Sequence, residues 1–237
     1  IGDKHYAIPE ISAIVLAEMR HLVQVHVGQT VNKAVITVPA FFNDAQRQST
    51  RDAGRIAGIE VLRILNEPTA AALAYGFNQK LKQRVAVYDL GGGTFDVSVL
   101  EIGDDVFEVL STSGDTYLGG DDFDARIMDW LLDIGQKKHG VDLRKNSESL
   151  QRIKNAAENA KIALSTDGET SVQVADLHDG SASKTFSISE VLTRARLDEM
   201  VKDLMGRTFL VCDEAMRAAG MHVKDLDAVI LVGGSTR

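Results

Sequence analysis

Hydrophobic residues in the first third of the chain follow the spacing of helices and strands in turn. In residues 9–27 they recur every three or four positions, which predicts an amphipathic helix. The runs "KAVITVPA" (33–40) and "IEVLRILN" (59–66) are short, apolar and rich in β-branched residues, which predicts two buried strands. A helix is expected after each strand, and Pro68 is expected at the first position of the second helix because its missing N–H costs nothing there.

The rest of the chain opens with three strands in a row. A polar link (78–83) leads into them, and a turn of three glycines joins the first two. A glycine-rich loop, "SGDTYLGGDD" (113–122), then precedes a region in which helices dominate. The predicted elements are strands at 84–90, 94–102 and 105–113, helices at 122–139 and 148–165, short strands near 169–176 and 183–188, helices within 189–220, and a buried strand at 227–234.

Two of the strands look like copies of each other. "KAVITVPA" and "DAVILVGG" both follow a helix, and both read charged-Ala-Val-Ile-x-Val. Three strands stand before the helical region that leads to the second copy, whereas only a helix stands before the first. The pattern therefore predicts an α/β protein built from a duplicated βββαβα unit, with the first unit incomplete.

The glycine turn carries the strongest sign of chemistry. In "VYDLGGGTFDVSVLEI" (87–102), Asp89 stands before the three glycines, and Thr94 and Asp96 stand after them. Glycines let several backbone N–H groups approach one phosphate, because no Cβ is in the way. Asp89 at the end of a buried strand would be stabilised by Mg²⁺ held through water, and Thr94 can offer a hydroxyl to a terminal phosphate oxygen. The alternative is a plain hairpin, since Gly-Gly turns between strands are common.

Two further positions allow either a functional or a structural interpretation. Glu67 lies between a buried strand and a helix start, where the helix dipole alone would favour an acid. Glu158, Lys161 and Ser165 align on another face of the 148–165 helix, apart from its Leu/Ile/Ala stripe. They are either an exposed ion-pair face or a polar face that meets the sugar hydroxyls of a ligand.

Composition narrows the classes of function. The chain has 237 residues and a formal net charge of −8, without a Lys/Arg stripe, which argues against nucleic acid as the main partner. No apolar run reaches the roughly 18 residues of a membrane span, and neither a P-loop nor a GxGxxG between a strand and a helix occurs. The single cysteine, Cys212, excludes an internal disulfide framework and is interpreted as a small buried residue. Because the chain begins at Ile1, it is expected to be a piece of a longer protein.

Six segments together resemble one family. They are "VITVPAFFNDAQRQSTRDAGRIAG", "ILNEPTAAALAYG", "VYDLGGGTFDVSVLEI", "GDTYLGGDDFD", "AAENAKIALS" and "VILVGGSTR". They are similar to the ATPase domain of the 70-kilodalton heat-shock chaperones (Hsp70, DnaK type), and the resemblance runs from about Pro9 to Arg237. It implies the actin-like ATPase (ribonuclease H-like) fold, with ATP or ADP and Mg²⁺ in a cleft, and ATP hydrolysis that drives cycles of unfolded-peptide binding and release. A cytoplasmic location and a role in the stress response are part of what it implies.

The resemblance assigns roles to the phosphate end of the site. Asp89 matches the acid that holds Mg²⁺ through water, Glu67 an acid near the attacking water and the metal shell, and Asp96 a nearby acid of the same cluster. With Thr94 these residues form the expected catalytic set. The hairpin that grips the β- and γ-phosphates matches Gly91, Gly92, Gly93 and Thr94.

The same comparison assigns the remaining contacts. Gly120 lies in a loop that matches a nucleotide contact, while Glu158, Lys161 and Ser165 match ribose and adenine contacts, which favours the functional interpretation of that helix face. The adenosine motif matches Gly233, Gly234, Ser235 and Arg237. A relay to a peptide-binding domain matches Pro39 and Arg47, and a docking surface for J-domain co-chaperones matches Arg63 and Asn66.

The resemblance also implies partners and a division into domains. The expected partners are unfolded client polypeptides, bound through a domain outside this sequence, a J-domain co-chaperone and a nucleotide exchange factor, with no nucleic acid and no membrane. Residues 1–78 would be an incomplete first lobe, 79–118 and 190–237 the base of the second, and 119–189 its inserted subdomain.

Departures from the family pattern weaken the expectation of turnover. The opening phosphate hairpin of the Asp-Leu-Gly-Thr-Thr type and the catalytic lysine have no counterpart in residues 1–237. This chain is therefore expected to bind nucleotide weakly, if at all, and to be impaired in ATP hydrolysis. Ile162 stands where eukaryotic cytosolic members carry an arginine, which indicates a bacterial-type origin.

Two other classes of protein share the expected fold. A sugar or acetate kinase would carry a substrate-specific acid in the cleft and no match to the segment from Pro39 to Arg47, which is present here. A non-enzymatic actin-like filament or scaffold would polymerise in a nucleotide-linked way.

Overall fold

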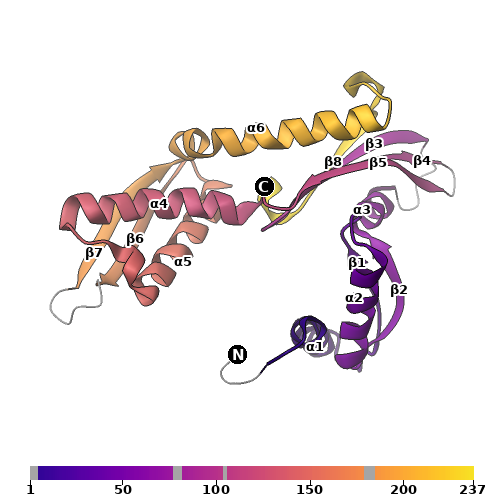
Figure 1. Cartoon of the computed structure of the whole chain (residues 1–237), viewed down its shortest axis with the longest axis horizontal. Coiled ribbons are helices and arrows are strands. Elements are labelled where there is room, and N and C mark those ends of the chain that lie inside the picture. Colours follow the sequence, from indigo (N-terminus) through magenta and orange to yellow (C-terminus); the bar gives the residue numbers. More distant parts are fainter. Residues whose placement is uncertain (1–4, 77–81, 104–105, 179–184) are drawn as a thin grey trace. The chain divides into compact units, whose positions relative to one another are not determined.

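A computed structural model describes residues 5–76, 82–103, 106–178 and 185–237 of the chain (Figure 1). Within these residues the structure is mixed α/β, as the sequence predicts, and most element boundaries lie within two or three residues of the predicted ones. The helices are α1 (Ile8–Val27), α2 (Asp44–Ile56), α3 (Glu67–Gly76), α4 (Gly120–His139), α5 (Ser147–Leu164) and α6 (Arg194–Ala218). The strands are β1 (Lys33–Val38), β2 (Glu60–Asn66), β3 (Gln83–Leu90), β4 (Phe95–Ile102), β5 (Phe107–Asp115), β6 (Glu169–Leu177), β7 (Phe186–Thr193) and β8 (Ala228–Val232), and three short 3-10 helices are η1 (Leu143–Lys145), η2 (Val223–Asp225) and η3 (Gly234–Thr236).

Local side-chain chemistry explains where several helices begin and end. The Asn43 side chain accepts the N–H of Gln46, and the Gln46 side chain accepts the N–H of Asn43, which caps α2 at both positions. Helix α4 ends at Gly140, whose φ of 71° favours glycine. Helix α3 begins at Glu67, so the prediction that Pro68 occupies its first position is wrong by one residue. No helix in the described ranges combines the length and hydrophobicity that a membrane span requires.

The region from 169 to 218 differs most from the prediction. The two short strands are a longer antiparallel pair, β6 and β7, in which Val174 faces Ile188. The predicted helices within 189–220 are one helix, α6, of 25 residues, which starts only after Thr193 caps it. In β7 the buried residues Ile188 and Leu192 alternate with exposed ones, which is the period of a strand rather than of a helix. Predicted strand residues 183 and 184 and most of the polar link (78–81) lie outside the described residues.

The chain divides into two compact units. Unit 1 holds residues 1–87, 98–112 and 224–230, and unit 2 holds residues 88–97, 113–223 and 231–237. The largest sheet has the strand order β5-β4-β3-β8, so the three successive strands of the sequence are neighbours, as predicted, and the final strand lies beside the first of them. The duplication of a βββαβα unit and the three-part division into lobes stay predictions.

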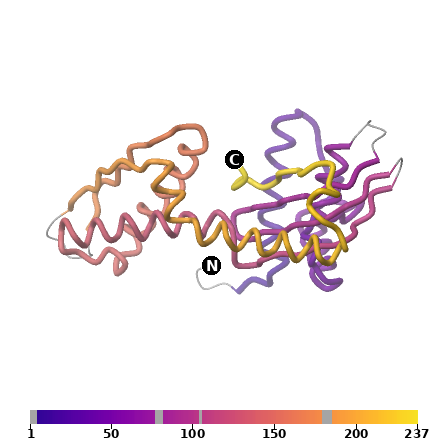
Figure 2. Tube along the Cα trace, turned by 90° about the horizontal axis from the view of Figure 1, so that it is seen from above, coloured from indigo at the N-terminus to yellow at the C-terminus, as the bar shows by residue number. Residues whose placement is uncertain are grey.

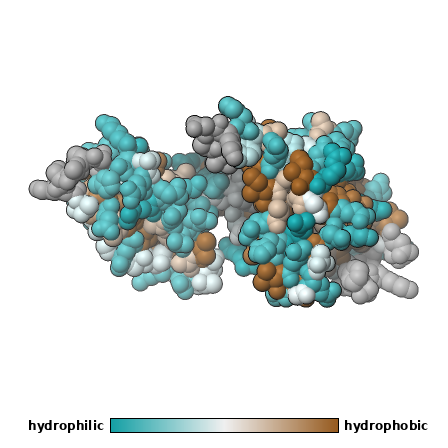
Figure 3. All heavy atoms as spheres, turned by 90° about the horizontal axis from the view of Figure 1, so that it is seen from below, coloured by the Kyte–Doolittle hydropathy of each residue, from teal (hydrophilic) through white to brown (hydrophobic). Residues whose placement is uncertain are grey.

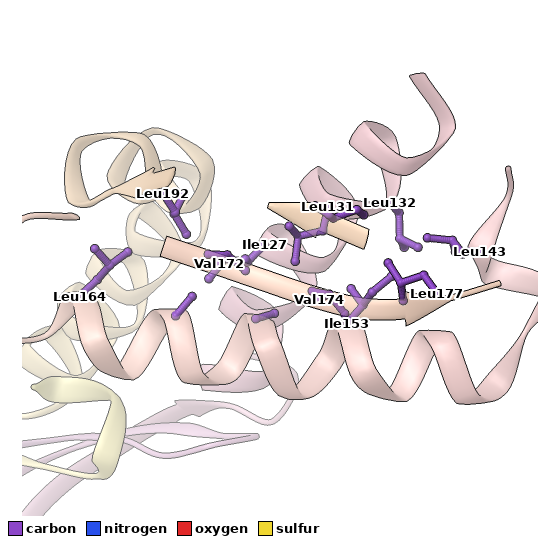
Figure 4. Close-up of a cluster of buried hydrophobic side chains, with 13 residues drawn as sticks. Ile127, Leu131, Leu132, Leu143, Ile153, Leu164, Val172, Val174, Leu177 and Leu192 are labelled. Atoms are coloured by element: carbon purple, nitrogen blue, oxygen red, sulfur yellow. The ribbon is translucent and has the colours of Figure 1, made fainter. Parts of the chain in front are cut away.

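A continuous core holds one end of unit 2 together. Helices α4 and α5 and the strands β6 and β7 gather there (Figure 2), and their buried side chains interlock (Figure 4). Ile127 and Leu131 come from α4, and Ile153 comes from α5. The cluster of thirteen buried hydrophobic residues is completed by Leu132, Leu143, Ala157, Ala160, Leu164, Val172, Val174, Leu177, Ile188 and Leu192.

Unit 1 has a much smaller core in its first 76 residues. Its strands β1 and β2 form a two-stranded parallel sheet, and a cluster of three buried alanines, Ala13, Ala53 and Ala57, joins α1 to α2. The part of unit 1 that contains α1 and α2 (Figure 1) exposes many hydrophobic side chains, drawn in brown in Figure 3. Val15 on α1 and Leu62 on β2, for example, are 58% and 57% exposed. Apolar area that stays in water contributes nothing to stability, so this part of unit 1 is held less firmly than the core of unit 2.

Limited proteolysis should detect this difference. We expect the first cuts within residues 1–83 and a resistant core of roughly 84–237, because local opening is easiest where little apolar surface is buried. Mass spectrometry of the fragments, with size-exclusion chromatography of the intact sample, measures both the cut sites and the oligomeric state. Uniform resistance of residues 1–83 in a monomeric sample would contradict the expectation.

Candidate functional site

The glycine hairpin between β3 and β4 presents unpaired backbone donors at the surface of unit 2. The N–H of Gly91 donates to the carbonyl of Thr94 at 3.0 Å, which closes the turn. Gly92, Gly93 and Thr94 are exposed. Within the part of the chain that the structure describes, no protein group accepts the N–H of Gly92 or Gly93. Successive backbone N–H groups that have no acceptor, on residues that have no side chain to block access, can bind an anion such as phosphate.

The start of α4 supports the hairpin from behind. The N–H groups of Gly120 and Asp121 donate to the carbonyls of Gly91 and Gly92 at 2.9 and 2.7 Å. A Cβ on Gly119 would lie 2.4 Å from the carbonyl oxygen of Gly92, so only glycine allows this approach. The hairpin carbonyls are therefore bonded to α4, while the N–H groups of Gly92 and Gly93 remain available.

The segment after β8 reaches the same hairpin. Gly233 has a φ of 87°, and a Cβ there would lie 2.1 Å from the carbonyl oxygen of Leu90. The hydroxyl of Ser235 donates to the carbonyl of Gly91 at 3.0 Å. The predicted residues Gly233 and Ser235 are thus brought to the predicted hairpin, although about 140 positions separate them in the sequence.

Helix α5 adds a positive charge and one wall of a cavity. The Lys161 ammonium donates to the carbonyl of Gly120 at 3.0 Å and to Oδ2 of Asp124 at 2.9 Å. A cavity of about 1070 Å³ opens beside it. Its lining includes the predicted residues Lys161, Ser165, Gly233, Gly234, Ser235 and Arg237, together with Ile162 and Arg194. Glu158 is exposed on the same helix but does not belong to that lining.

Two carboxylates lie at the ends of the strands that the hairpin joins. Burial raises the pKa of Asp89 above its ordinary value. Burial also raises the pKa of Asp96, the negative charge of Asp89 raises it further, and a hydrogen bond from Thr94 opposes both effects. Among the described residues no three His, Cys, Asp or Glu side chains converge on a metal position. A bound cation would nevertheless reduce the repulsion between these two partly buried carboxylates. Mg²⁺ needs only one or two carboxylates, because it keeps most of its water ligands.

The remaining predicted residues belong to unit 1. Glu67 is the first residue of α3, and Arg63 is exposed on β2. Arg47 donates to the side chain of Asn66 at 2.8 Å and to the carbonyls of Ala40 and Phe42 in the loop that follows Pro39. The predicted relay and the predicted docking surface are therefore joined by one hydrogen bond.

Sequence reasoning missed two residues that support the hairpin and Lys161. Gly119 supports the hairpin only through a contact between segments distant in the sequence, which no local pattern reveals. Asp124 does leave a local signal, because it falls on the stripe of α4 that is otherwise buried and apolar, beside Phe123, Ile127 and Leu131. An acid on such a stripe is unusual and indicates a specific partner.

A comparison with protein families agrees with these observations. The family model described as "Hsp70 protein" matches residues 1–237, which is the whole chain. The mixed α/β structure is the kind expected of the ATPase domain of that family. The chain therefore belongs to the Hsp70 family, whose members are in general chaperones that bind and hydrolyse ATP.

Proposed function

We propose that unit 2 binds an adenine nucleotide, with its phosphates on the hairpin of Gly91, Gly92 and Gly93. The observation that carries this proposal is the direction of the hairpin's backbone groups. The carbonyls of Gly91 and Gly92 are bonded to α4 and to Ser235, whereas the N–H groups of Gly92 and Gly93 are exposed and have no acceptor among the residues that the structure describes. The hydroxyl of Thr94, which bonds to Asp96 in this structure, would turn away from that acid to donate to the terminal phosphate.

The acids beside the hairpin fit Mg²⁺. Asp89 would hold the ion through water, and Asp96 is the adjacent acid of the cluster. The family resemblance alone proposes Glu67 of unit 1 as a further acid for the ion. The ion, when bound, would supply positive charge against the phosphate oxygens. The raised pKa of Asp89 and of Asp96 supports this assignment, since both carboxylates lack a cationic partner among the described groups that act on them. In the proposed reaction these groups orient water for in-line attack, and catalysis is mainly positioning and charge neutralisation.

The adenosine part of the ligand is assigned to the cavity beside α5. Lys161 and Ser165 on one wall, with Gly233, Gly234 and Arg237 on the other, are proposed to bind ribose and adenine. Glu158 is proposed as a further ribose contact one turn before Lys161. Ile162, which is 58% exposed and lines the cavity, offers an apolar surface to the base.

The wider role that we propose is that of a chaperone. ATP hydrolysis would drive binding and release of unfolded client polypeptides, with a J-domain protein at Arg63 and Asn66 and a nucleotide exchange factor as partners. Pro39 and Arg47 would carry the nucleotide state toward a peptide-binding domain. The hydrogen bond between Arg47 and Asn66 supports a connection between these two surfaces. A cytoplasmic location and a role in the stress response belong to the same proposal.

A titration of this chain with ATP and ADP, with and without Mg²⁺, tests the proposed function directly. We expect weak binding and little phosphate release, because no second phosphate hairpin and no counterpart of the family's catalytic lysine occur in residues 1–237. Calorimetry measures the binding, and a phosphate-release assay measures turnover. Steady release at the rate of a complete ATPase domain would contradict the expectation of impaired turnover, and the absence of any nucleotide binding would contradict the proposed function.

The substitution Asp89→Asn tests the proposed metal position. Mg²⁺ should strengthen ADP binding to the unaltered chain, and the variant should lose most of that effect. Residues that hold a metal through a second group typically contribute about 10–100-fold to metal affinity. The melting temperature should not fall, because burial already disfavours the charge at this position. Asp129→Asn, which breaks only a surface ion pair with Arg144 at a 67% exposed side chain, is the control and should change neither quantity, since exposed ion pairs contribute little. If the Mg²⁺ effect survives in Asp89→Asn, this acid does not serve the metal.

The substitution Gly120→Ala tests the placement of the Ser235 and Lys161 side chains beside the start of α4. A Cβ on Gly120 would lie 2.4 Å from Oγ of Ser235 and 2.9 Å from Nζ of Lys161, so both side chains must move and ADP affinity should fall. The control is Gly206→Ala in α6, where a Cβ meets nothing within 4 Å. That variant should keep its ADP affinity and gain up to about 1 kcal/mol in stability, since alanine is the better helix former. Equal ADP affinities of the two variants would show that this placement of Ser235 and Lys161 is not needed for binding.

A further inference from the structure

A buried carboxylate stands behind the lysine of the candidate site. Asp124 lies on α4, its side chain is only 4% exposed, and its Oδ2 is 2.9 Å from Nζ of Lys161. Its other oxygen, Oδ1, is buried and has no hydrogen-bond partner among the described residues. Burial raises the pKa of Asp124 in spite of the neighbouring Lys161, while Glu158 and Asp121 raise it further.

This arrangement does not favour stability. The other buried residues of the α4 stripe, such as Phe123 and Ile127, are apolar. An unpaired buried acceptor costs free energy, and a well-packed apolar residue often stabilises a protein as much as a buried ion pair does. A role at the site therefore accounts for Asp124 better than a role in folding does.

The geometry of Lys161 indicates what that role is. An ammonium group has three donors, and here one goes to the carbonyl of Gly120 and one to Asp124. The third donor is left, and the side chain of Lys161 is 20% exposed and lines the cavity. Lysine is a flexible point charge, and two fixed acceptors remove most of that freedom before a ligand arrives.

We propose that Asp124 is a positioning residue: together with the Gly120 carbonyl it fixes the Lys161 ammonium at the cavity, where the remaining donor meets the nucleotide. Asp124 itself does not touch the ligand. This inference rests on the proposed nucleotide-binding function. It requires that Asp124 act only through Lys161, which distinguishes it from a residue that merely holds α4 and α5 together.

Chemical labelling of Lys161 tests the first step without any ligand. The chain, Asp124→Asn and Asp133→Asn are treated with an amine-acylating reagent, and mass spectrometry follows the rate at each lysine. Asp133 is an exposed acid on the same helix, and Lys154 is an exposed lysine on α5 that serves as the internal reference. Asparagine keeps an acceptor oxygen but removes the charge, so Lys161 should be labelled about fivefold faster, the difference between a charge-assisted and a neutral hydrogen bond.

Asp133→Asn should leave the rate at Lys161 unchanged. An unchanged rate in Asp124→Asn would overturn the proposal. A faster rate accompanied by faster hydrogen exchange along α5 would also overturn it, because that result indicates loosening of the helix rather than release of one side chain.

A double-mutant cycle on ADP affinity tests the second step. Asp124→Asn should weaken ADP binding by up to the loss seen in Lys161→Met, and the double variant should bind no more weakly than Lys161→Met alone. Additive losses, or tighter binding by Asp124→Asn, would overturn the proposal. If the unaltered chain does not bind ADP, the proposed function fails, whereas the labelling rates still decide by themselves whether Asp124 holds Lys161.

Discussion

The candidate site depends on a close approach between two pieces of backbone. The first N–H groups of α4 donate to the carbonyls of Gly91 and Gly92, which a Cβ on Gly119 would prevent. A helix normally leaves its first four N–H groups without partners inside the helix, so this contact satisfies donors of α4 and acceptors of the hairpin together. It also sets the orientation of the hairpin: because the carbonyls face α4, the N–H groups of Gly92 and Gly93 face the other way, where a ligand can reach them. Lys161 and Ser235 reach the same point from two other elements.

Features that depend on neighbouring residues were predictable from the sequence. The spacing of apolar residues located nearly every helix and strand, and the cluster of glycines and acids between 89 and 96 located the hairpin. Gly233 and Ser235 were assigned to the site only by the resemblance to a family, and in the structure both lie against the hairpin. The main error was to assign residues 189–193 to a helix. They are the second half of the strand β7, which directly precedes the long helix α6.

Features that depend on contacts between distant segments were not predictable in this way. Nothing local indicates that Gly119 faces Gly92 or that Asp124 faces Lys161, 37 positions away. The acid on the apolar stripe of α4 could have indicated an unknown partner, but only the fold identifies that partner. The two units also differ in how they use hydrophobic residues: α4 and α5 bury theirs in one cluster, whereas α1 has a single fully buried residue, Ala13.

Helix α4 joins the hairpin to the core of unit 2 as one rigid element. A helix of 20 residues is about 30 Å long. Its first residue is bonded to Gly91, its middle carries Ile127 and Leu131 into the core, and its last residue, His139, stacks on Phe186 of β7. Because one helix makes all three contacts, a change in its orientation about the core would also displace Gly120 and the hairpin carbonyls bonded to the start of the helix. The position of the Gly91 and Gly92 peptide groups is thus tied, through the length of α4, to contacts at the opposite end of unit 2.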